Sequence, residues 1–328
     1  MTVADLLGRW ELFAHLTGGQ LEKLAPCVSL GSHPQGEAIL RQGDPTLEAY
    51  VIESGRVRIQ RDTPYGVFAF AELGPGNLFG ETAFVDRRVR SGDAVAATEC
   101  ELLRLNPVAL SSLMEGDRGL SVALYWTFWK SLSRKLRDTN DKLTRFFSES
   151  APPAESAPPA GGAPGPDFRV DLDAKRRVFE EQRLSNMEIN FLAALSREVN
   201  LHPGEMIFRE GEEGDSLYVV LEGRVMISKI IPGAGEEALA FLERGDYFGE
   251  MALIDREPRS ADAQAGEEGA VVLAIPRDVL AGILDIGKPS SLRLLKLLCS
   301  LVARRLRELD EKIVGWFMLA GGDQGPGG

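Results

Sequence analysis

The sequence is poor in the residues that build redox, metal and membrane-spanning sites. It has only three cysteines and three histidines in 328 residues, and both sets are scattered along the chain. The spacing of Cys27, Cys100 and Cys299 excludes a disulfide framework or a zinc-finger pattern, and it indicates reduced, partly buried thiols. The chain also lacks a run of eighteen apolar residues and a secretory signal at its start. We therefore expect a cytoplasmic protein that neither spans nor binds a membrane.

Signatures of catalysis and of duplex nucleic-acid binding are missing as well. We find no kinase, cyclase or P-loop pattern, and we expect no catalytic residues, no metal and no cofactor. The net charge is −12, with 17 basic against 19 acidic residues in 1–149 and 20 against 30 in 150–328. Duplex-DNA binders usually present a basic stripe, so this balance disfavours nucleic acid as a partner.

One segment has the composition of a linker. Residues 148–167 read SESAPPAESAPPAGGAPGPD, in which Pro, Ala, Gly and Ser dominate without apolar periodicity. Such a segment cannot bury enough surface to offset its ordering entropy, which predicts a flexible to semi-extended connection. We therefore predict a first domain over 1–147, the linker over 148–167, a second domain over 168–317 and a disordered tail over 318–328.

The two predicted domains are copies of one another. VIESGRVRI at 51–59 matches VVLEGRVMI at 219–227, and FGETAFVDRRVRSGDA at 79–94 matches FGEMALIDREPRSADA at 248–263. The offset between the copies grows by one residue between these two stretches, which places a net insertion in the intervening hairpin. The chain is therefore a tandem duplication.

Each copy predicts the same order of elements. A short helical lead precedes short strands rich in Val, Ile, Leu and aromatics, with glycines at the corners. A long helix follows, over 119–147 and over 289–317. Many short strands with glycine corners are typical of a double-sheet β-roll of jelly-roll type. The predicted fold class is therefore mainly β with flanking helices, in two β-rolls that each end in a long helix.

The repeated sixteen-residue stretch carries chemistry suited to a phosphorylated sugar. In the second copy, Gly249 would allow close backbone approach, and the N–H groups that begin the following turn would attract an anion. Glu250 would accept a hydrogen bond from a ribose hydroxyl. Arg259 offers a planar fork of donors that fits a phosphate, and Ser260 adds a hydroxyl beside it. An isolated Arg and Glu nine residues apart would more often form a solvated ion pair, but here the whole stretch occurs twice.

These residues make both copies resemble cyclic-nucleotide-binding domains, as in catabolite activators and protein-kinase regulatory subunits. Residues 248–261 match the family's F-G-E-x-A-L…P-R-S/T-A phosphate-binding cassette, and a preceding Gly, Asp, Tyr and Val pattern also matches. The resemblance implies that Glu250 holds the ribose 2′-hydroxyl and Arg259 the cyclic phosphate of cyclic AMP or cyclic GMP. It also implies that Gly249, Met251, Ala252 and Ser260 complete the cradle. Ser91 and Ser260 leave the choice between adenine and guanine open.

The first copy departs from this pattern. Val89 replaces the proline before Arg90, Gly92 replaces an alanine, and Thr82 stands where an apolar residue is usual. Losing a proline and gaining a glycine should leave the loop less pre-organised. We expect this site to bind more weakly or with another base preference. Its predicted ligand-binding residues are Gly80, Glu81, Thr82, Ala83, Arg90 and Ser91.

The resemblance also implies an output through the long helices, which in the family close over the base. Residues 289–317 have an apolar stripe that would either pack on their own roll or form a homodimer seam. Trp126, Trp129 and Trp316 would either cap a base or pack. The predicted function is a non-enzymatic cyclic-nucleotide sensor that signals to an unknown protein partner. The alternatives are an interaction scaffold in which one or both rolls no longer bind ligand, and a transcription regulator without the usual helix-turn-helix.

Overall fold

The computed structural model describes residues 1–148, 172–182, 184, 186–231, 235–284 and 292–319. The predicted linker lies outside the described residues except for Ser148, which ends a helix. The predicted tail also lies outside them, apart from residues 318 and 319. The domain limits given above therefore remain predictions.

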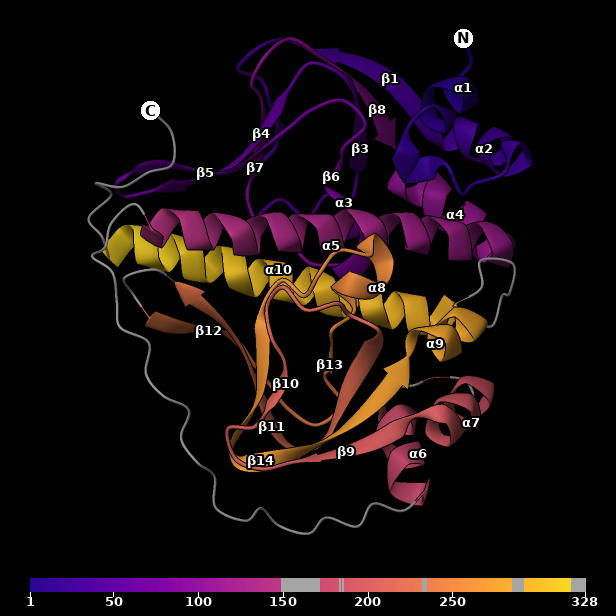
Figure 1. The fold of residues 1–328 in the computed structure, drawn as a ribbon. Helices are drawn as coiled ribbons and strands as arrows, with labels where there is room; N and C mark the ends of the chain where they lie inside the picture. The colour runs from indigo at the N-terminus through magenta and orange to yellow at the C-terminus, as the bar shows by residue number, and fades with distance from the viewer. Residues whose placement is uncertain (149–171, 183, 185, 232–234, 285–291, 320–328) are drawn as a thin grey trace. The chain divides into compact units, whose positions relative to one another are not determined.

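The first repeat contains two four-stranded antiparallel sheets with short helices before, between and after them (Figure 1). The strand orders are β1-β8-β3-β6 and β2-β7-β4-β5. The elements are α1 Val3–Gly8, η1 Glu11–Phe13, α2 Gly18–Leu24, η2 Ala25–Cys27, β1 Val28–His33, β2 Ala38–Leu40, β3 Ala49–Ser54, β4 Val57–Thr63, β5 Gly66–Leu73, β6 Leu78–Phe79, α3 Glu81–Asp86, β7 Asp93–Ala96, β8 Cys100–Leu105, α4 Pro107–Gly116 and α5 Arg118–Ser148.

The elements of the second repeat follow the same order. Two of its strands are long and continuous, and all six strands belong to one antiparallel sheet. Its elements are α6 Leu172–Glu181, α7 Asn186–Leu195, β9 Arg197–Leu201, β10 Met206–Phe208, β11 Ser216–Ile231, β12 Gly235–Leu242, β13 Tyr247–Phe248, α8 Met251–Asp255, β14 Asp262–Pro276, α9 Arg277–Ile283 and α10 Leu292–Leu319. The predicted fold class, two β-rolls each ending in a long helix, is confirmed.

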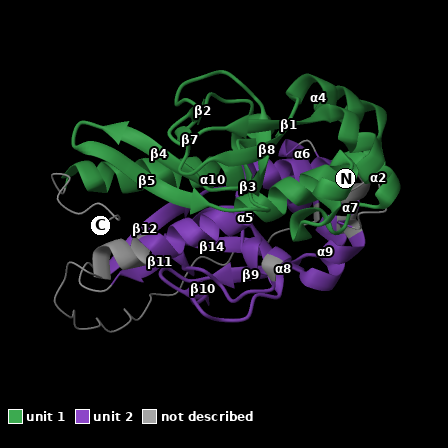
Figure 2. Ribbon diagram, turned by 90° about the horizontal axis from the view of Figure 1, so that it is seen from above, with its two compact units in different colours: residues 1–132, 302–328 green, residues 133–301 purple. Residues whose placement is uncertain are grey.

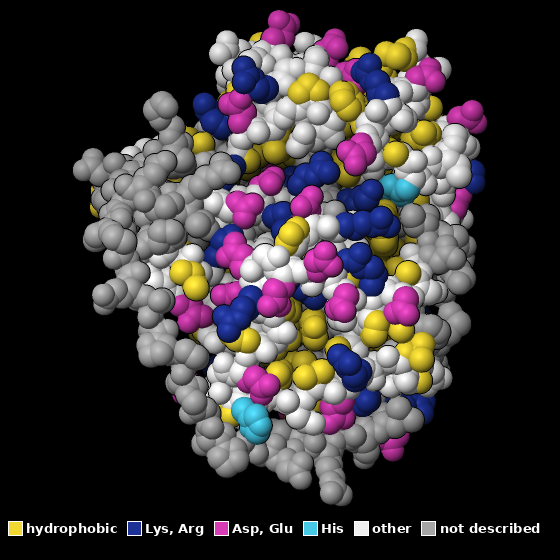
Figure 3. Space-filling model, in the orientation of Figure 1, with side chains coloured by type: hydrophobic (Ala, Val, Ile, Leu, Met, Phe, Trp, Pro, Cys, Tyr) yellow, Lys and Arg dark blue, Asp and Glu magenta, His cyan; other side chains and the backbone are white. Residues whose placement is uncertain are grey.

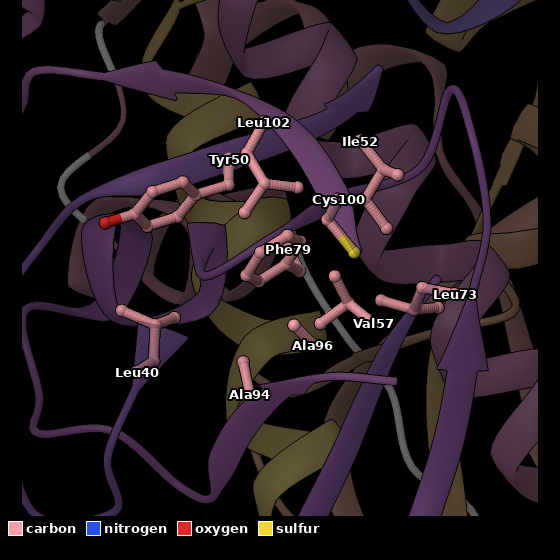
Figure 4. Close-up of a cluster of buried hydrophobic side chains, with 10 residues drawn as sticks. All are labelled: Leu40, Tyr50, Ile52, Val57, Leu73, Phe79, Ala94, Ala96, Cys100 and Leu102. Carbon is pink, nitrogen blue, oxygen red and sulfur yellow. The ribbon is translucent and has the colours of Figure 1, made fainter. Parts of the chain in front are cut away.

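Each roll encloses its own apolar core. In the first roll, strands from both sheets point side chains inward to one cluster, and Phe79 stacks on Tyr50 with ring centroids 5.2 Å apart (Figure 4). In the second roll, Phe248 and Tyr218 stack at 5.1 Å in the corresponding place. Both aromatic pairs hold the short strand that leads directly into the repeated stretch, so the core fixes where that stretch begins. The first cluster contains Leu40, Tyr50, Ile52, Val57, Leu73, Phe79, Ala94, Ala96, Cys100 and Leu102.

Contacts divide the chain into two compact units that do not coincide with the two repeats (Figure 2). Unit 1 contains residues 1–132 together with 302–328, and unit 2 contains residues 133–301. Each unit therefore holds one roll, the first part of one long helix and the last part of the other. The apolar stripe of residues 289–317 predicted packing on the helix's own roll or a homodimer seam, but not this exchange of helix ends.

The cysteines are free thiols, as predicted, and all three are buried. Partial burial was predicted, but the side chains of Cys100 and Cys299 are completely buried, at 0% exposure. Cys299 lies within the apolar stripe of α10, where burial raises the pKa of its thiol well above the usual value. This burial fits a packing role for the Cys299 side chain.

Candidate functional site

The site of the second roll begins where β13 ends. Gly249 follows with a φ of +78°, and α8 begins two residues later. A Cβ at this glycine would lie 2.6 Å from Nη1 of Arg259 and 3.1 Å from the carbonyl oxygen of Ser216. Glycine is therefore required here by its left-handed backbone and by the arginine that packs against it. The close approach of a ligand to this glycine stays a prediction.

Arg259 is buried at 5% exposure and held by backbone carbonyls. Its Nη1 donates to the Gly249 carbonyl at 2.7 Å, and its Nη2 donates to the Ser216 carbonyl at 2.9 Å. The guanidinium carbon lies 4.2 Å from the ring centroid of Phe208. Its Nε is buried without a hydrogen-bond partner among the described residues. The arginine is thus held in one orientation with donor capacity left over.

The carboxylate predicted to accompany this arginine is buried with it. Glu250 is 3% exposed and lies at the start of α8. Burial lowers the pKa of the Arg259 guanidinium, and the negative charge of Glu250 is among the influences that raise it again. The hydroxyl of Ser260 donates towards the sulfur of Met251 at 3.7 Å. The structure therefore brings together the residues predicted for this site, and their role in binding remains a prediction.

The first roll builds the same arrangement. Arg90 is 4% exposed and donates from Nη1 to the Gly80 carbonyl and from Nη2 to the Glu48 carbonyl, both at 2.7 Å. Its Nε donates to the hydroxyl of Thr46 at 3.1 Å. Glu81 is fully buried, and its Oε1 accepts a hydrogen bond from Ser131 on α5 at 2.7 Å. Both buried groups of the predicted first site are thus present.

The loops that carry the two arginines are fixed by matching backbone hydrogen bonds. The backbone N–H of Arg90 donates to the backbone carbonyl of Asp44 at 3.0 Å, and the backbone N–H of Arg259 donates to the backbone carbonyl of Glu212 at 2.8 Å. Val89 is 51% exposed, so its side chain contributes little packing to the loop. A Cβ at Gly92 would lie 2.8 Å from the Gln60 carbonyl, so the glycine there lets strand and loop come close. The predicted weaker pre-organisation of this loop stays a prediction.

Several residues that sequence analysis missed surround these sites. Within unit 2, Arg137 donates to the Pro258 carbonyl at 2.8 Å, and Asn140 lies 3.4 Å from the Ser260 hydroxyl. Within unit 1, Arg307 makes a two-point ion pair with Asp86 at the end of α3, at 2.6 and 3.1 Å. The signal was available, because Arg137 and Arg307 occupy corresponding places in the two long helices. Each repeated stretch is therefore contacted by the helix of the other repeat.

Two of the three tryptophans named above, Trp126 and Trp129, pack against each other, and the choice between packing and capping a base stays a prediction. Trp129 is 1% exposed, and its ring lies 5.3 Å from that of Trp126 in an edge-to-face contact.

Among the described residues, no group of His, Cys, Asp and Glu could hold a metal ion. The described helices include none long and apolar enough to cross a bilayer.

Comparison with known proteins identifies the family. The model of the cyclic nucleotide-binding domain matches residues 31–117 and 198–286, which together make up more than half of the chain. The chain therefore belongs to the cyclic nucleotide-binding domain family, with two copies of the domain. The recognition of two such domains from the repeated stretch is confirmed.

Individual relatives match most of the chain at low identity. The chain is 29% identical to a cAMP-dependent protein kinase regulatory subunit of Yarrowia lipolytica, over 70% of this chain and 47% of that protein. It is 22% identical to cGMP-dependent protein kinase 2 of Homo sapiens, over 84% of this chain and 30% of the kinase. A solved structure of the regulatory domain of Toxoplasma gondii PKA with cAMP is 18% identical over 96% of this chain and 95% of that chain, at a TM-score of 0.32. The chain thus spans about a third of the curated kinase and about half of the regulatory subunit.

Proposed function

We propose that this chain is a non-enzymatic sensor that binds one cyclic nucleotide, cyclic AMP or cyclic GMP, in each β-roll. The observation that carries the proposal is the pair of buried groups found at the same place in both rolls, Arg259 with Glu250 and Arg90 with Glu81. Burying an arginine and a glutamate is costly unless other groups compensate their charges. Two copies of such a pair beside a glycine-led turn favour a negatively charged sugar ligand over a purely structural role.

The chemistry follows from the donors and acceptors in the second site. Arg259 uses one N–H of each terminal nitrogen on backbone carbonyls, and its remaining donors would bind the cyclic phosphate. Glu250 would accept the ribose 2′-hydroxyl. Backbone N–H groups at Met251 and Ala252, in the first turn of α8, would face the phosphate together with Ser260. In the first site, Gly80, Thr82, Ala83 and Ser91 would act in the same way around Arg90 and Glu81.

The output proposed for the chain is a change in how its helices engage a protein partner. The relatives named above include regulatory subunits of cyclic-nucleotide-dependent kinases, which supports a kinase as the partner class. On the described surface in Figure 3, basic side chains lie among acidic ones, which suits a protein better than duplex nucleic acid. We place the protein in the cytoplasm. A homodimer through 289–317 is less favoured, because Leu306, Leu309 and Ile313 of that stripe are already buried within the chain.

Isothermal titration calorimetry of the full chain tests the proposal. The wild type is titrated with cyclic AMP and with cyclic GMP, beside Arg259→Ala and the exposed control Arg224→Ala. We expect saturable heat with one of the nucleotides, a weakened site in Arg259→Ala and unchanged binding in the control. No heat with either nucleotide, in wild type and variant alike, would remove the proposal.

A further inference from the structure

A buried cation lies beside the site arginine in each roll. Lys229 on β11 and Arg61 on β4 occupy corresponding places in the two repeats, and their side chains are only 3% and 7% exposed. Lys229 Nζ donates to the carbonyl of Ser260 at 3.3 Å. Arg61 Nε donates to the carbonyl of Ser91 at 3.1 Å. Each cation thus holds the backbone of the residue that follows the site arginine.

Each cation is also paired with an acid on the long helix of the other repeat. Within unit 2, Lys229 lies 3.2 Å from Asp141 of α5 and 2.9 Å from Glu210. Within unit 1, Arg61 lies 2.9 Å from Glu311 of α10. Asp141 and Glu311 correspond in the two helices, as Lys229 and Arg61 do in the two strands. The same three-part connection, from loop carbonyl to cation to helix acid, is therefore built twice with different side chains.

Such a connection is more than an incidental surface contact. A buried ammonium or guanidinium needs partners for its donors, because an uncompensated buried charge is strongly destabilising. The carbonyl at the site and the acid on the helix supply those partners. In unit 2 the residue before Asp141 adds a second contact, since the Asn140 amide reaches the hydroxyl of the same Ser260. One turn of α5 therefore contacts this serine at its hydroxyl and, through Lys229, at its carbonyl.

We propose that Lys229 and Arg61 are positioning residues that dock the long helix of the other repeat onto each binding site. A ligand that orders the loop around Ser260 would favour docking of the 133–142 segment of α5, and docking would in turn strengthen ligand binding, since such coupling is reciprocal. Full affinity of the second site would therefore depend on Asp141, a residue encoded by the first repeat. This inference rests on the proposed cyclic-nucleotide binding and specifies which residues regulate it.

The test measures the second site alone, in a full-length chain whose first site is disabled by Arg90→Leu. Asp141→Asn removes the helix charge at a half-exposed position without altering the core. Lys229→Met removes the cation, and Lys229→Arg restores it. Glu243→Gln is the matched control, because it breaks an exposed ion pair with Arg224, which lies on the same strand as Lys229. With the nucleotide that the wild type binds, we expect Asp141→Asn and Lys229→Met to weaken binding about tenfold, and Lys229→Arg and the control to leave it unchanged.

A second measurement distinguishes a loss of docking of the 133–142 segment from a general loss of stability of the protein. Hydrogen exchange over 133–142 should slow when nucleotide is added to the wild type and to Lys229→Arg. It should not respond to nucleotide in Asp141→Asn. Wild-type affinity and a wild-type exchange response in Asp141→Asn would overturn the inference. If the parent chain itself failed to bind, the proposed function would fail instead, so the two failures are distinguishable.

Discussion

The two rolls hold their site arginines with the same carbonyls but differ at one neighbouring position. In the first roll, Thr46 provides a hydroxyl for Nε of Arg90 at 3.1 Å. In the second, the corresponding residue is Gly214, and Nε of Arg259 is buried without a partner among the described residues. The Nε donor of the first arginine is therefore occupied within the protein, whereas the Nε donor of the second lacks a partner among the described residues. This difference distinguishes the two sites independently of the loop proline.

The largest effect is expected from filling the space at Gly214. A Cβ there would lie 2.9 Å from Arg259 and even closer to Ala252. Gly214→Ala should therefore displace the arginine, weaken the second site and lower the free energy of unfolding by about 1–3 kcal/mol, the usual cost of overpacking. Titration and urea unfolding measure both effects. The matched change Thr46→Ala in the first roll removes a hydrogen bond to a charged guanidinium, which costs about 1.5–3 kcal/mol of stability, but it introduces no clash and should leave the affinity of the first site unchanged. Equal losses of affinity in the two rolls would contradict the comparison.

Replacing the buried glutamates tests whether both sites bind the ribose 2′-hydroxyl through a carboxylate. Glu250→Gln and Glu81→Gln should each weaken binding at their own site by about 1.5–3 kcal/mol, the range for a hydrogen bond to a charged group. A 2′-deoxy cyclic nucleotide should show this loss with the wild type and little further loss with the variants. Calorimetry with both nucleotides measures the difference. An additional full loss in the variants would mean that the glutamates do not bind the 2′-hydroxyl.

A proline at position 89 should bring the affinity of the first site closer to that of the second site. Val89 is exposed, and its counterpart in the second copy is Pro258. Val89→Pro should reduce the freedom of the unbound loop and tighten the first site by about 0.4–1 kcal/mol. The measurement is made in an Arg259→Leu background so that only the first site reports. An exposed control, Val108→Ala, should leave the affinity unchanged, whereas weaker binding by the proline variant would refute the role assigned to Val89.

The smallest expected effect is the pH dependence that His15 contributes to the stability of unit 1. Burial lowers the pKa of His15, whose Nε2 lies 2.9 Å from the Ala123 carbonyl of α5. Because the folded-state pKa lies below the unfolded value of about 6.5, its contribution to stability is complete above that pH. This contribution is lost as the pH falls from there towards the folded pKa. Urea unfolding at pH 7.5 and 5.5 should show a smaller loss at acidic pH for His15→Gln than for the wild type.

The sequence predicted those features that depend on local pattern. The alternating strands, the glycine before each short helix and the Arg and Glu of each repeated stretch are all encoded within a few residues of one another. The helix exchange was not predictable in this way, because an apolar stripe on α10 does not specify which roll covers it. Lys229 and Arg61 were missed because a basic residue in a strand ordinarily points to solvent. Only their recurrence at the same place in both repeats could have drawn attention to them.

The most direct test of two arginine-centred sites is the number of nucleotides bound per chain. Calorimetric titration should give two for the wild type, one for Arg259→Leu, one for Arg90→Leu and none for the double variant. The single variant that keeps Arg259 should bind more tightly than the one that keeps Arg90. Two nucleotides bound by the double variant, with its fold intact by circular dichroism, would contradict the account.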